Sequence, residues 1–438
     1  MRAHLLRSEP GLGVSYATAH LIQRALAMTP DARILVLVPR ALQAQTQDLL
    51  LGLDVKADAV DRFRYREMQD SAPVHGTVWP LGEVSILSID FAKQKDIARS
   101  LAMVPWTLMI VQEAHLVRGL RDEMVRQVVD SSPNLRVLLT SVTGTDYIPT
   151  LGIEQLETTI WRRSHAVDQA GKFPQIETRL EILDFHEAAA DLFLREFIEE
   201  IVDKLPTNSS AALLSKLFRR SLASSPPALE ESVRRFRNRL APGFLALAPS
   251  ERDDDEDHIN ALPSEMPEDA ELVAVLNECL AEIDCFPGDS KFDALVTKIT
   301  KMRSDNSLPF SLAVITEYRA TLFYLQAQLE ESGFKTNILH GAMTLDERAQ
   351  SVDRFKIEGG ILLATTATMN EGLNLSQIEG LILYDLPSSK LRLEQIHGRF
   401  QQFGRTTPLK LGVLYNLDDP DPAAANSLDK LREIIATE

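Results

Sequence analysis

Short apolar runs alternate along this chain with longer stretches in which apolar residues recur at every third or fourth position. Runs with so few polar residues are typical of strands buried on both faces of a parallel sheet. The clearest are residues 34–39, 106–112, 311–316, 336–340, 361–365 and 381–385. Stretches such as residues 16–27 and 321–332 have helical spacing. Strands and helices that alternate in this way predict an α/β fold with parallel sheets covered by helices on both faces.

The middle of the chain lacks this alternation. Residues 165–288 are rich in helical periodicity, and residues 187–204 alternate apolar and acidic positions as one amphipathic helix does. The acidic run at residues 251–257 is typical of a solvated loop. We therefore expect a first α/β lobe at residues 1–164, a helical insertion with an acidic loop at residues 165–288, and a second α/β lobe at residues 289–438.

The composition is that of an ordinary globular protein long enough for two or three domains. Of the 438 residues, 45% are hydrophobic and 25% are charged. No apolar run approaches the roughly 18 residues that span a bilayer, and the first residues lack the apolar region of a secretory leader. We therefore expect a cytoplasmic protein. Only Cys279 and Cys285 occur, which supports neither a disulfide framework nor a zinc site.

The charge balance limits the ways in which nucleic acid can bind. A net charge of −17 argues against a protein that coats nucleic acid with its whole surface, although it leaves room for a local basic groove. The most basic stretch, residues 215–240, contains Lys216, Arg219, Arg220, Arg234, Arg235, Arg237 and Arg239. Two interpretations stay open: this stretch tracks phosphates, or it is a solvated helical face balanced by the acidic loop that follows.

A glycine-rich turn lies between an apolar segment and a helical stretch at the start of the chain. Residues 4–8 are predicted to form a short strand, Gly11 and Gly13 follow, and helical character begins at Tyr16. A strand, a glycine loop and a helix form the geometry of a phosphate-binding loop, in which backbone N–H groups and the helix N-terminus face the anion.

A second polar cluster lies near two strands of the second α/β region. Residues 371–375 lie between the strands predicted at 361–365 and 381–385, and residues 395–399 follow the second of these strands. Open α/β sheets bind their ligands at the carboxyl ends of parallel strands. The sequence therefore predicts a ligand site here.

Together these segments resemble the motifs of superfamily 2 helicases. The sequences E-G-L-N-L at 371–375, Y-D-L-P at 384–387 and L-E-Q-I-H-G-R at 393–399 are most similar to Swi/Snf-type ATPases, especially the bacterial RapA-like branch. The sequences E-P-G-L-G-V-S at 9–15 and Q-E-A-H at 112–115 are similar to the nucleotide-binding motifs of that family. The resemblance implies two tandem RecA-like lobes of the P-loop NTPase fold, with ATP and Mg²⁺ as cofactors.

The resemblance also implies roles for single residues. It makes Glu113 and Arg399 the residues of ATP hydrolysis, with Glu113 polarising the attacking water. It implies that Gly11, Gly13, Ser15, Gln395 and Glu371 contact the nucleotide. The hydroxyl group of Ser15 would also hold Mg²⁺. It implies nucleic-acid contacts from Arg40, Gln45, Lys93, Gly341 and Asn374. For this last group, ordinary loops that cap strand ends are the alternative interpretation.

Four positions depart from the family pattern, and each departure removes a charge. Val14 takes the place of the lysine that reaches the β- and γ-phosphates. Gln112 takes the place of an aspartate that holds Mg²⁺, and an amide is a poorer partner for a hard cation than a carboxylate. Thr366 replaces another aspartate. Gln402 replaces the arginine finger, a group worth roughly 10³ to 10⁵ in turnover.

The apolar strands and glycines around these positions match the family, whereas the charges do not. The sequence therefore favours a catalytically silent helicase-like module that binds nucleic acid or, more readily, a protein partner. The alternative is an active ATP-dependent DNA translocase that works with Glu113 and Arg399. A third arrangement, in which another subunit supplies the missing lysine or arginine, also stays open.

Overall fold

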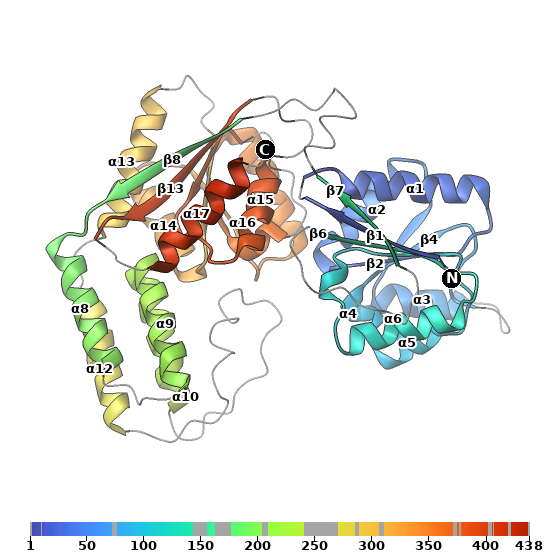
Figure 1. Ribbon diagram of the computed structural model, residues 1–438, viewed down its shortest axis with the longest axis horizontal. Helices are drawn as coiled ribbons and strands as arrows, with labels where there is room; N and C mark the ends of the chain where they lie inside the picture. Colours follow the sequence, from blue (N-terminus) through green and yellow to red (C-terminus); the bar gives the residue numbers. More distant parts are fainter. Residues whose placement is uncertain are drawn as a thin grey trace.

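The computed structural model of the 438-residue chain contains two α/β lobes and a helical module, as Figure 1 shows. Lobe 1 lies at the N-terminal end of the chain, and lobe 2 contains the C-terminal half together with one earlier strand. The structure describes residues 2–9, 11–71, 77–142, 156–162, 177–203, 209–240, 270–284, 289–305, 311–370, 375, 378–401, 405, 407–418 and 422–436.

The sheet of lobe 1 has seven strands in the order β3-β4-β2-β5-β6-β1-β7. All of its described pairs are parallel, which confirms the prediction from the apolar runs. The strands are β1 (Arg2–Ser8), β2 (Ile34–Val38), β3 (Ala57–Val60), β4 (Val84–Ser88), β5 (Leu108–Val111), β6 (Arg136–Val142) and β7 (Leu156–Trp161).

Helices cover both faces of this sheet. In the central strand β2, Leu35 and Leu37 belong to the apolar core on one face, while Ile34 and Val36 belong to the core on the other. Helices α1 and α2 pack on the second of these cores, and α3 to α6 pack on the first. The helical elements of lobe 1 are α1 (Val14–Met28), η1 (Arg40–Leu42), α2 (Gln43–Leu51), α3 (Arg62–Ser71), α4 (Ile89–Ala92), α5 (Lys95–Ala102), η2 (Ala114–Leu116) and α6 (Leu120–Ser131).

The sheet of lobe 2 has six strands in the order β10-β11-β9-β12-β13-β8, and its described pairs are again parallel. One boundary needs correction, because β8 pairs with β13 although it lies inside the stretch predicted as the helical insertion, residues 165–288. The predicted end of lobe 1 at residue 164 and the predicted start of the second α/β lobe at residue 289 stay predictions. The strands are β8 (Thr178–Phe185), β9 (Ser311–Thr316), β10 (Thr336–Leu339), β11 (Gly360–Thr365), β12 (Gly380–Leu383) and β13 (Leu409–Asn416).

Side-chain caps fix the start of two helices in lobe 2. Asp289 accepts a hydrogen bond from the backbone N–H of Phe292 at 3.0 Å, so the predicted N-cap of α13 is confirmed. Thr344 and Glu347 form a capping box at α15. The helical elements of this lobe are α13 (Ser290–Asp305), α14 (Arg319–Glu331), α15 (Leu345–Glu358), η3 (Thr366–Asn370), α16 (Lys390–Phe400) and α17 (Pro422–Ala436).

The helical module extends from lobe 2 and has its own apolar core. Its helices share buried residues such as Leu194, Phe218, Phe236 and Leu276. They are α8 (Ala189–Asp203), α9 (Ser209–Ser224), α10 (Pro226–Leu240) and α12 (Ala270–Asp284). The predicted amphipathic helix at residues 187–204 therefore corresponds to α8, and the acidic run lies outside the described residues.

The basic stretch on α9 and α10 is largely paired within the chain. Its ion pairs are Arg219 with Glu199, Arg220 with Glu317, Arg234 with Glu230, and Arg235 with Glu231. These contacts favour the solvated helical face over a surface that tracks phosphates.

Two further predictions concern membrane-spanning helices and the two cysteines. Across the described ranges, no helix combines the length and the hydropathy that a bilayer crossing requires. Cys279 is a free, buried thiol, and Cys285 lies outside the described residues.

Candidate functional site

The glycine loop follows β1 and leads directly into α1. Gly11 and Gly13 have φ values of 84° and 77°, in the left-handed region that favours glycine. Gly13 is the N-cap of α1 and Val14 is its first residue, so the backbone of the loop retains the geometry suited to an anion. Ser15 is the second residue of the helix. The positive side chain expected at Val14 is missing.

Gly11 contacts lobe 2 directly. A Cβ atom on Gly11 would lie 2.7 Å from the carbonyl oxygen of Gly398 and 3.0 Å from that of Gln401. Both carbonyls belong to the C-terminal end of α16, the helix that also contains Gln395 and Arg399. The structure thus brings the glycine loop and the segment at residues 395–399 together across the boundary between the lobes.

Glu113 occupies a strained position just after β5. Its φ and ψ values of 51° and 49° are left-handed, which is uncommon for a residue other than glycine. Its side chain is 26% exposed, yet its Oε2 atom is enclosed and accepts no hydrogen bond from the described residues. Burial raises the pKa of Glu113, and the positive charge of Arg399 opposes this rise. The two predicted catalytic residues therefore interact across the boundary between the lobes.

His115 links this site to β6. Its Nδ1 atom lies 3.1 Å from Ser141 Oγ and 3.5 Å from Glu113 Oε2. Burial lowers the pKa of His115, and the nearby Arg118 lowers it further, so the imidazole is neutral near pH 7. The contact at Ser141 is therefore a neutral hydrogen bond between η2 and the end of β6.

Arg399 is held by its own lobe. Its Nε atom donates to the carbonyl oxygen of Met369 at 2.8 Å. Burial lowers the pKa of Arg399, and Glu113 raises it in part. One turn earlier, burial raises the pKa of Glu394, Lys390 opposes this rise, and the negative charge of Glu9 in lobe 1 adds to it. Among the described residues, the boundary therefore carries an attractive pair of charges, Glu113 with Arg399, and a repulsive pair, Glu9 with Glu394.

These residues fit a Mg²⁺–ATP group poorly. Gln112 is a buried neutral amide whose backbone N–H donates to Leu37, and Thr366 is a buried hydroxyl in η3. Val14 has no charge to place beside a phosphate. Within the ranges that the structure covers, no three His, Cys, Asp or Glu side chains gather as a metal site requires. Glu371 and Gln402 lie outside those ranges.

Arg405 does not substitute for the missing arginine finger. Its guanidinium donates to the carbonyl oxygens of Ile378, Phe400 and Thr407 at 2.9, 3.1 and 2.8 Å, and the residue is 1% exposed. Because these carbonyls all belong to lobe 2, the side chain braces the end of α16 from inside that lobe.

The residues expected to contact nucleic acid lie near strand ends of both lobes. Arg40 and Gln45 are exposed in η1 and α2 after β2, and Lys93 forms an ion pair with Asp90 at 2.7 Å after β4. Gly341 follows β10, and its carbonyl accepts a hydrogen bond from Arg348. Asn374 lies outside the described residues. Their contact with nucleic acid stays a prediction.

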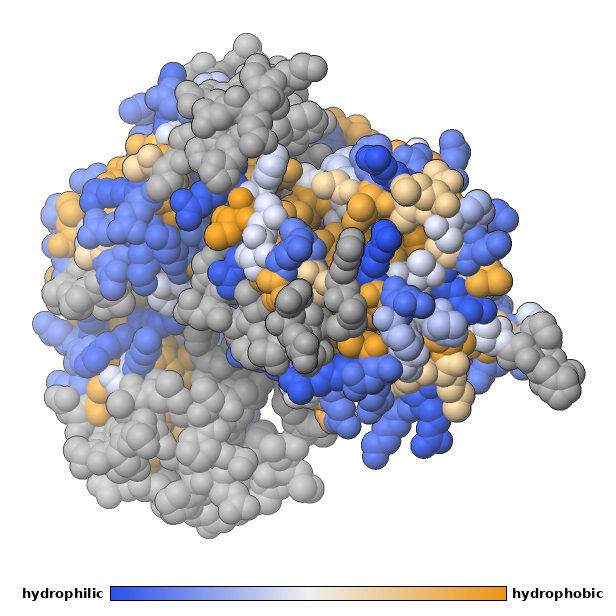
Figure 2. Space-filling model, turned by 45° about the vertical axis from the view of Figure 1, so that its right-hand side comes forward, coloured by the Kyte–Doolittle hydropathy of each residue, from blue (hydrophilic) through white to orange (hydrophobic). Residues whose placement is uncertain are grey.

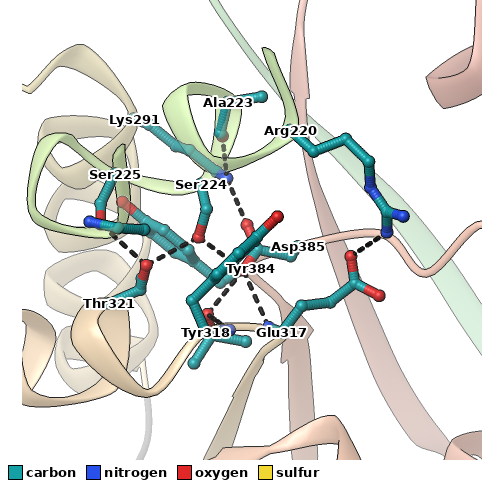
Figure 3. Close-up of polar contacts among 12 residues, drawn as sticks. Arg220, Ala223, Ser224, Ser225, Lys291, Glu317, Tyr318, Thr321, Tyr384 and Asp385 are labelled. Atoms are coloured by element: carbon teal, nitrogen blue, oxygen red, sulfur yellow. Dashed lines mark hydrogen bonds and ion pairs between the residues drawn. The ribbon is translucent and has the colours of Figure 1, made fainter. Parts of the chain in front are cut away.

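A buried polar cluster that the sequence did not predict is centred on Asp385, two residues after the end of β12 (Figure 3). Asp385 accepts hydrogen bonds from Lys291 Nζ at 2.8 Å, Ser224 Oγ at 2.8 Å, the Glu317 backbone N–H at 2.9 Å, and Thr316 Oγ1. Burial alone would raise the pKa of Asp385, but Lys291, the Thr316 hydroxyl and the Glu317 backbone N–H hold it below its ordinary value. Four segments of the chain therefore meet at one carboxylate.

This cluster seats the helical module on lobe 2. Ser224 and Ser225, at the junction of α9 and α10, each lie 2.7 Å from Thr321 Oγ1 of α14. Ser225 also accepts a hydrogen bond from the backbone N–H of Ala228 and so caps α10. The sequence signals here are the Y-D-L-P segment that contains Asp385 and the basic stretch at residues 215–240, which contains Ser224 and Ser225.

A crevice of about 340 Å³ lies beside the cluster, at the carboxyl ends of β9 and β12. The chain continues from β9 toward one side of the sheet and from β12 toward the other, so this is a topological switch point, where open α/β sheets bind ligands. Two ion pairs in its wall join Arg220 to Glu317 and Lys291 to Asp385 (Figure 3). Helix α9 covers this point, so lobe 2 uses it to hold the helical module.

The comparisons with known proteins agree with this architecture. Residues 290–404 match the family model described as helicase conserved C-terminal domain. The Bacillus subtilis protein named uncharacterized ATP-dependent helicase YqhH is 23% identical over 92% of this chain and 70% of its own length. The RNA polymerase-associated protein RapA of Pseudomonas aeruginosa is 25% identical over 93% of this chain. The chain spans only 44% of that RapA protein.

Solved structures show the same fold at low identity. The helicase domain of Pyrococcus furiosus Hef gives a TM-score of 0.56 at 16% identity, covering 96% of this chain and 94% of that one. Dbp5 of S. cerevisiae, solved with RNA and ADP BeF3, gives 0.52 at 14% identity, covering 100% of this chain and 84% of that one. Both comparisons confirm the predicted pair of RecA-like lobes. The chain is therefore helicase-like: its second lobe matches the helicase conserved C-terminal domain, and most of its length is similar to RapA and to a protein named as an ATP-dependent helicase.

Proposed function

We propose that this chain is a helicase-like module that does not turn over ATP and that serves as a binding surface for a protein partner or for nucleic acid. One observation carries this proposal. The backbone of the glycine loop keeps its form, with Gly13 as the N-cap of α1, while Val14 and Gln112 put neutral groups where a nucleotide needs charge.

The size of the missing electrostatic contribution supports the proposal. A unit charge about 4 Å from a phosphate oxygen contributes about 4 kcal/mol at an effective dielectric constant of about 20. This energy corresponds to roughly a thousandfold in affinity. A helix N-terminus supplies only about half a charge. The carbonyls of Gly398 and Gln401 near Gly11 add partial negative charge at the same place.

Two measurements test the absence of turnover. Purified full-length protein should show no Mg²⁺-dependent ATP hydrolysis with or without duplex DNA, and a titration with a fluorescent ATP analogue should show no saturable binding at micromolar concentration. Val14→Lys alone should not create turnover, because Gln112 stays neutral. Hydrolysis at an ordinary motor rate that Glu113→Gln abolishes would overturn the proposal.

The nature of the partner follows from charge and from the relatives. A net charge of −17 disfavours tight, non-specific binding of nucleic acid. One relative is named for its association with RNA polymerase, and a solved structure of similar fold contains RNA. We therefore favour a protein partner such as a nucleic-acid polymerase. Binding of purified RNA polymerase in an interferometry assay, compared with binding of duplex DNA and of RNA, tests this choice.

A specific observation also supports the second candidate, an active ATP-dependent translocase. Glu113 retains its carboxylate, its enclosed Oε2 atom accepts no hydrogen bond from the described residues, and Arg399 acts on it across the boundary. A buried oxygen in this state is suited to holding a water molecule. Turnover that is lost in Glu113→Gln and in Arg399→Ala would establish this candidate.

A further inference from the structure

The contact between the glycine loop and α16 places two carbonyls from the C-terminal end of α16 against Gly11, three residues before α1 begins. The loop leads into the N-terminus of α1, where backbone N–H groups leave about half a positive charge. The C-terminus of α16 carries carbonyl oxygens with the opposite partial charge. Within α16, the carbonyl of His397 accepts from Gln401 N–H, whereas the carbonyl of Gly398 points toward Gly11.

We propose that the packing of the Gly398 and Gln401 carbonyls against Gly11 holds the two lobes together without a nucleotide. The closed arrangement, which in a nucleotide-driven enzyme would require ligand, becomes the resting state of this protein.

The end of α16 is fixed firmly enough to serve this purpose. His397 Nε2 lies 2.9 Å from Thr178 Oγ1, and Gln401 Nε2 donates to the same hydroxyl at 2.6 Å. Arg405 donates to the carbonyl of Phe400 at 3.1 Å. These contacts all lie within lobe 2, so the turn that meets Gly11 is held in place within its lobe and moves only with lobe 2.

Charges across the boundary act in the same region. The carboxylate of Glu113 and the guanidinium of Arg399 attract each other, while Glu9 and Glu394 repel. Because the repulsive pair opposes closure, the backbone contact at Gly11 and the attraction between Glu113 and Arg399 must outweigh it.

The chain offers a matched pair of glycines for a test. Gly11 and Gly13 have nearly the same positive φ, so alanine strains the backbone similarly at both. A Cβ on Gly11 meets the carbonyl of Gly398 at 2.7 Å, whereas a Cβ on Gly13 meets nothing within 4 Å. Gly11→Ala therefore disturbs the contact between lobes, and Gly13→Ala is its control.

Single-molecule Förster resonance energy transfer between two dyes, one on each lobe, measures the separation of the lobes. Met28 in lobe 1 and Ile357 in lobe 2 are 75% and 84% exposed, and each can be replaced by cysteine for labelling after Cys279→Ala and Cys285→Ala. We expect the otherwise unchanged chain to occupy one closed population, both without nucleotide and with Mg²⁺–ATP. Gly11→Ala should raise the ratio of open to closed molecules by roughly five- to a hundredfold, and Gly13→Ala should leave it unchanged.

Two results would overturn the inference. One is that the chain without a glycine substitution is open in the absence of nucleotide and closes only when Mg²⁺–ATP is added. The other is equal opening in Gly11→Ala and Gly13→Ala. Neither result depends on hydrolysis, so ATP turnover by a closed wild-type chain would contradict the proposed function while leaving this inference intact.

Discussion

Lys291 Nζ lies 2.8 Å from Asp385 Oδ1, and this buried ion pair joins the start of α13 to the end of β12. The same ammonium group donates to the carbonyl of Ala223 at 2.6 Å and lies 4.2 Å from the centre of the Tyr384 ring. Helix α16 begins at Lys390, shortly after Asp385. The helical module and the helix that contacts the glycine loop are therefore anchored at one site.

Breaking this pair should be much costlier than breaking an exposed one. Lys291→Met leaves the carboxylate of Asp385 buried without its counter-ion, and removing one partner of a buried pair costs about 3 to 5 kcal/mol. Urea unfolding of the variant measures this loss. The control is Lys390→Met, which breaks an exposed pair with Glu433 and should cost less than about 1 kcal/mol. Equal losses of unfolding free energy in the two variants would show that the buried ion pair contributes no more to stability than the exposed one.

The Asp385 cluster should also make stability depend on pH at the acid end. The pKa of Asp385 lies below its ordinary value of 3.8, because its donors outweigh the effect of burial. A carboxyl whose pKa falls on folding stabilises the fold above its unfolded pKa, and this contribution disappears as the pH falls through the folded pKa. The difference in unfolding free energy between wild type and Asp385→Asn should therefore be constant above about pH 5 and shrink below 3.8.

Strands were predicted where burial on both faces left a simple signal. The apolar run of β9 (Ser311–Thr316) is such a case, since five of its six residues are buried. Strand β8 was missed, because its sequence, T-R-L-E-I-L-D-F, alternates polar and apolar residues as an edge strand does, within a stretch of helical periodicity. Its pairing with β13 depends on residues more than 200 positions away, which no local pattern contains.

The candidate site was predictable only in part for the same reason. The glycine loop can be recognised from the sequence, because a left-handed turn before a helix favours glycine at positions such as Gly11 and Gly13. What Gly11 touches depends on how two lobes pack, and the sequence gives no sign of the contact with Gly398. Asp385 could be recognised as part of Y-D-L-P, but its bonds to Ser224 and Lys291 join distant parts of the chain.

Glu113→Gln should stabilise the fold increasingly as the pH rises. Burial raises the pKa of Glu113 above its ordinary value of 4.5, and Arg399 only partly offsets this. A carboxyl whose pKa rises on folding favours the folded state fully only below its unfolded pKa, and stability falls as the pH rises toward the folded pKa. Unfolding by urea at several pH values should show variant and wild type alike near pH 4 and the variant more stable at pH 8. Glu433→Gln, at an exposed site, is the control. A difference that does not change with pH would contradict the prediction.

Arg405→Gln should weaken lobe 2 and should not improve nucleotide binding. The arginine donates to the carbonyls of Ile378, Phe400 and Thr407, and a shorter amide cannot reach them all. Each buried carbonyl that loses its donor costs about 1 to 3 kcal/mol, which thermal unfolding would detect against the exposed control Arg432→Gln. Because Phe400 ends α16, the same change should also increase the open population of the lobes. Unchanged stability together with new ATP binding would instead mean that Arg405 blocks a site that is otherwise competent.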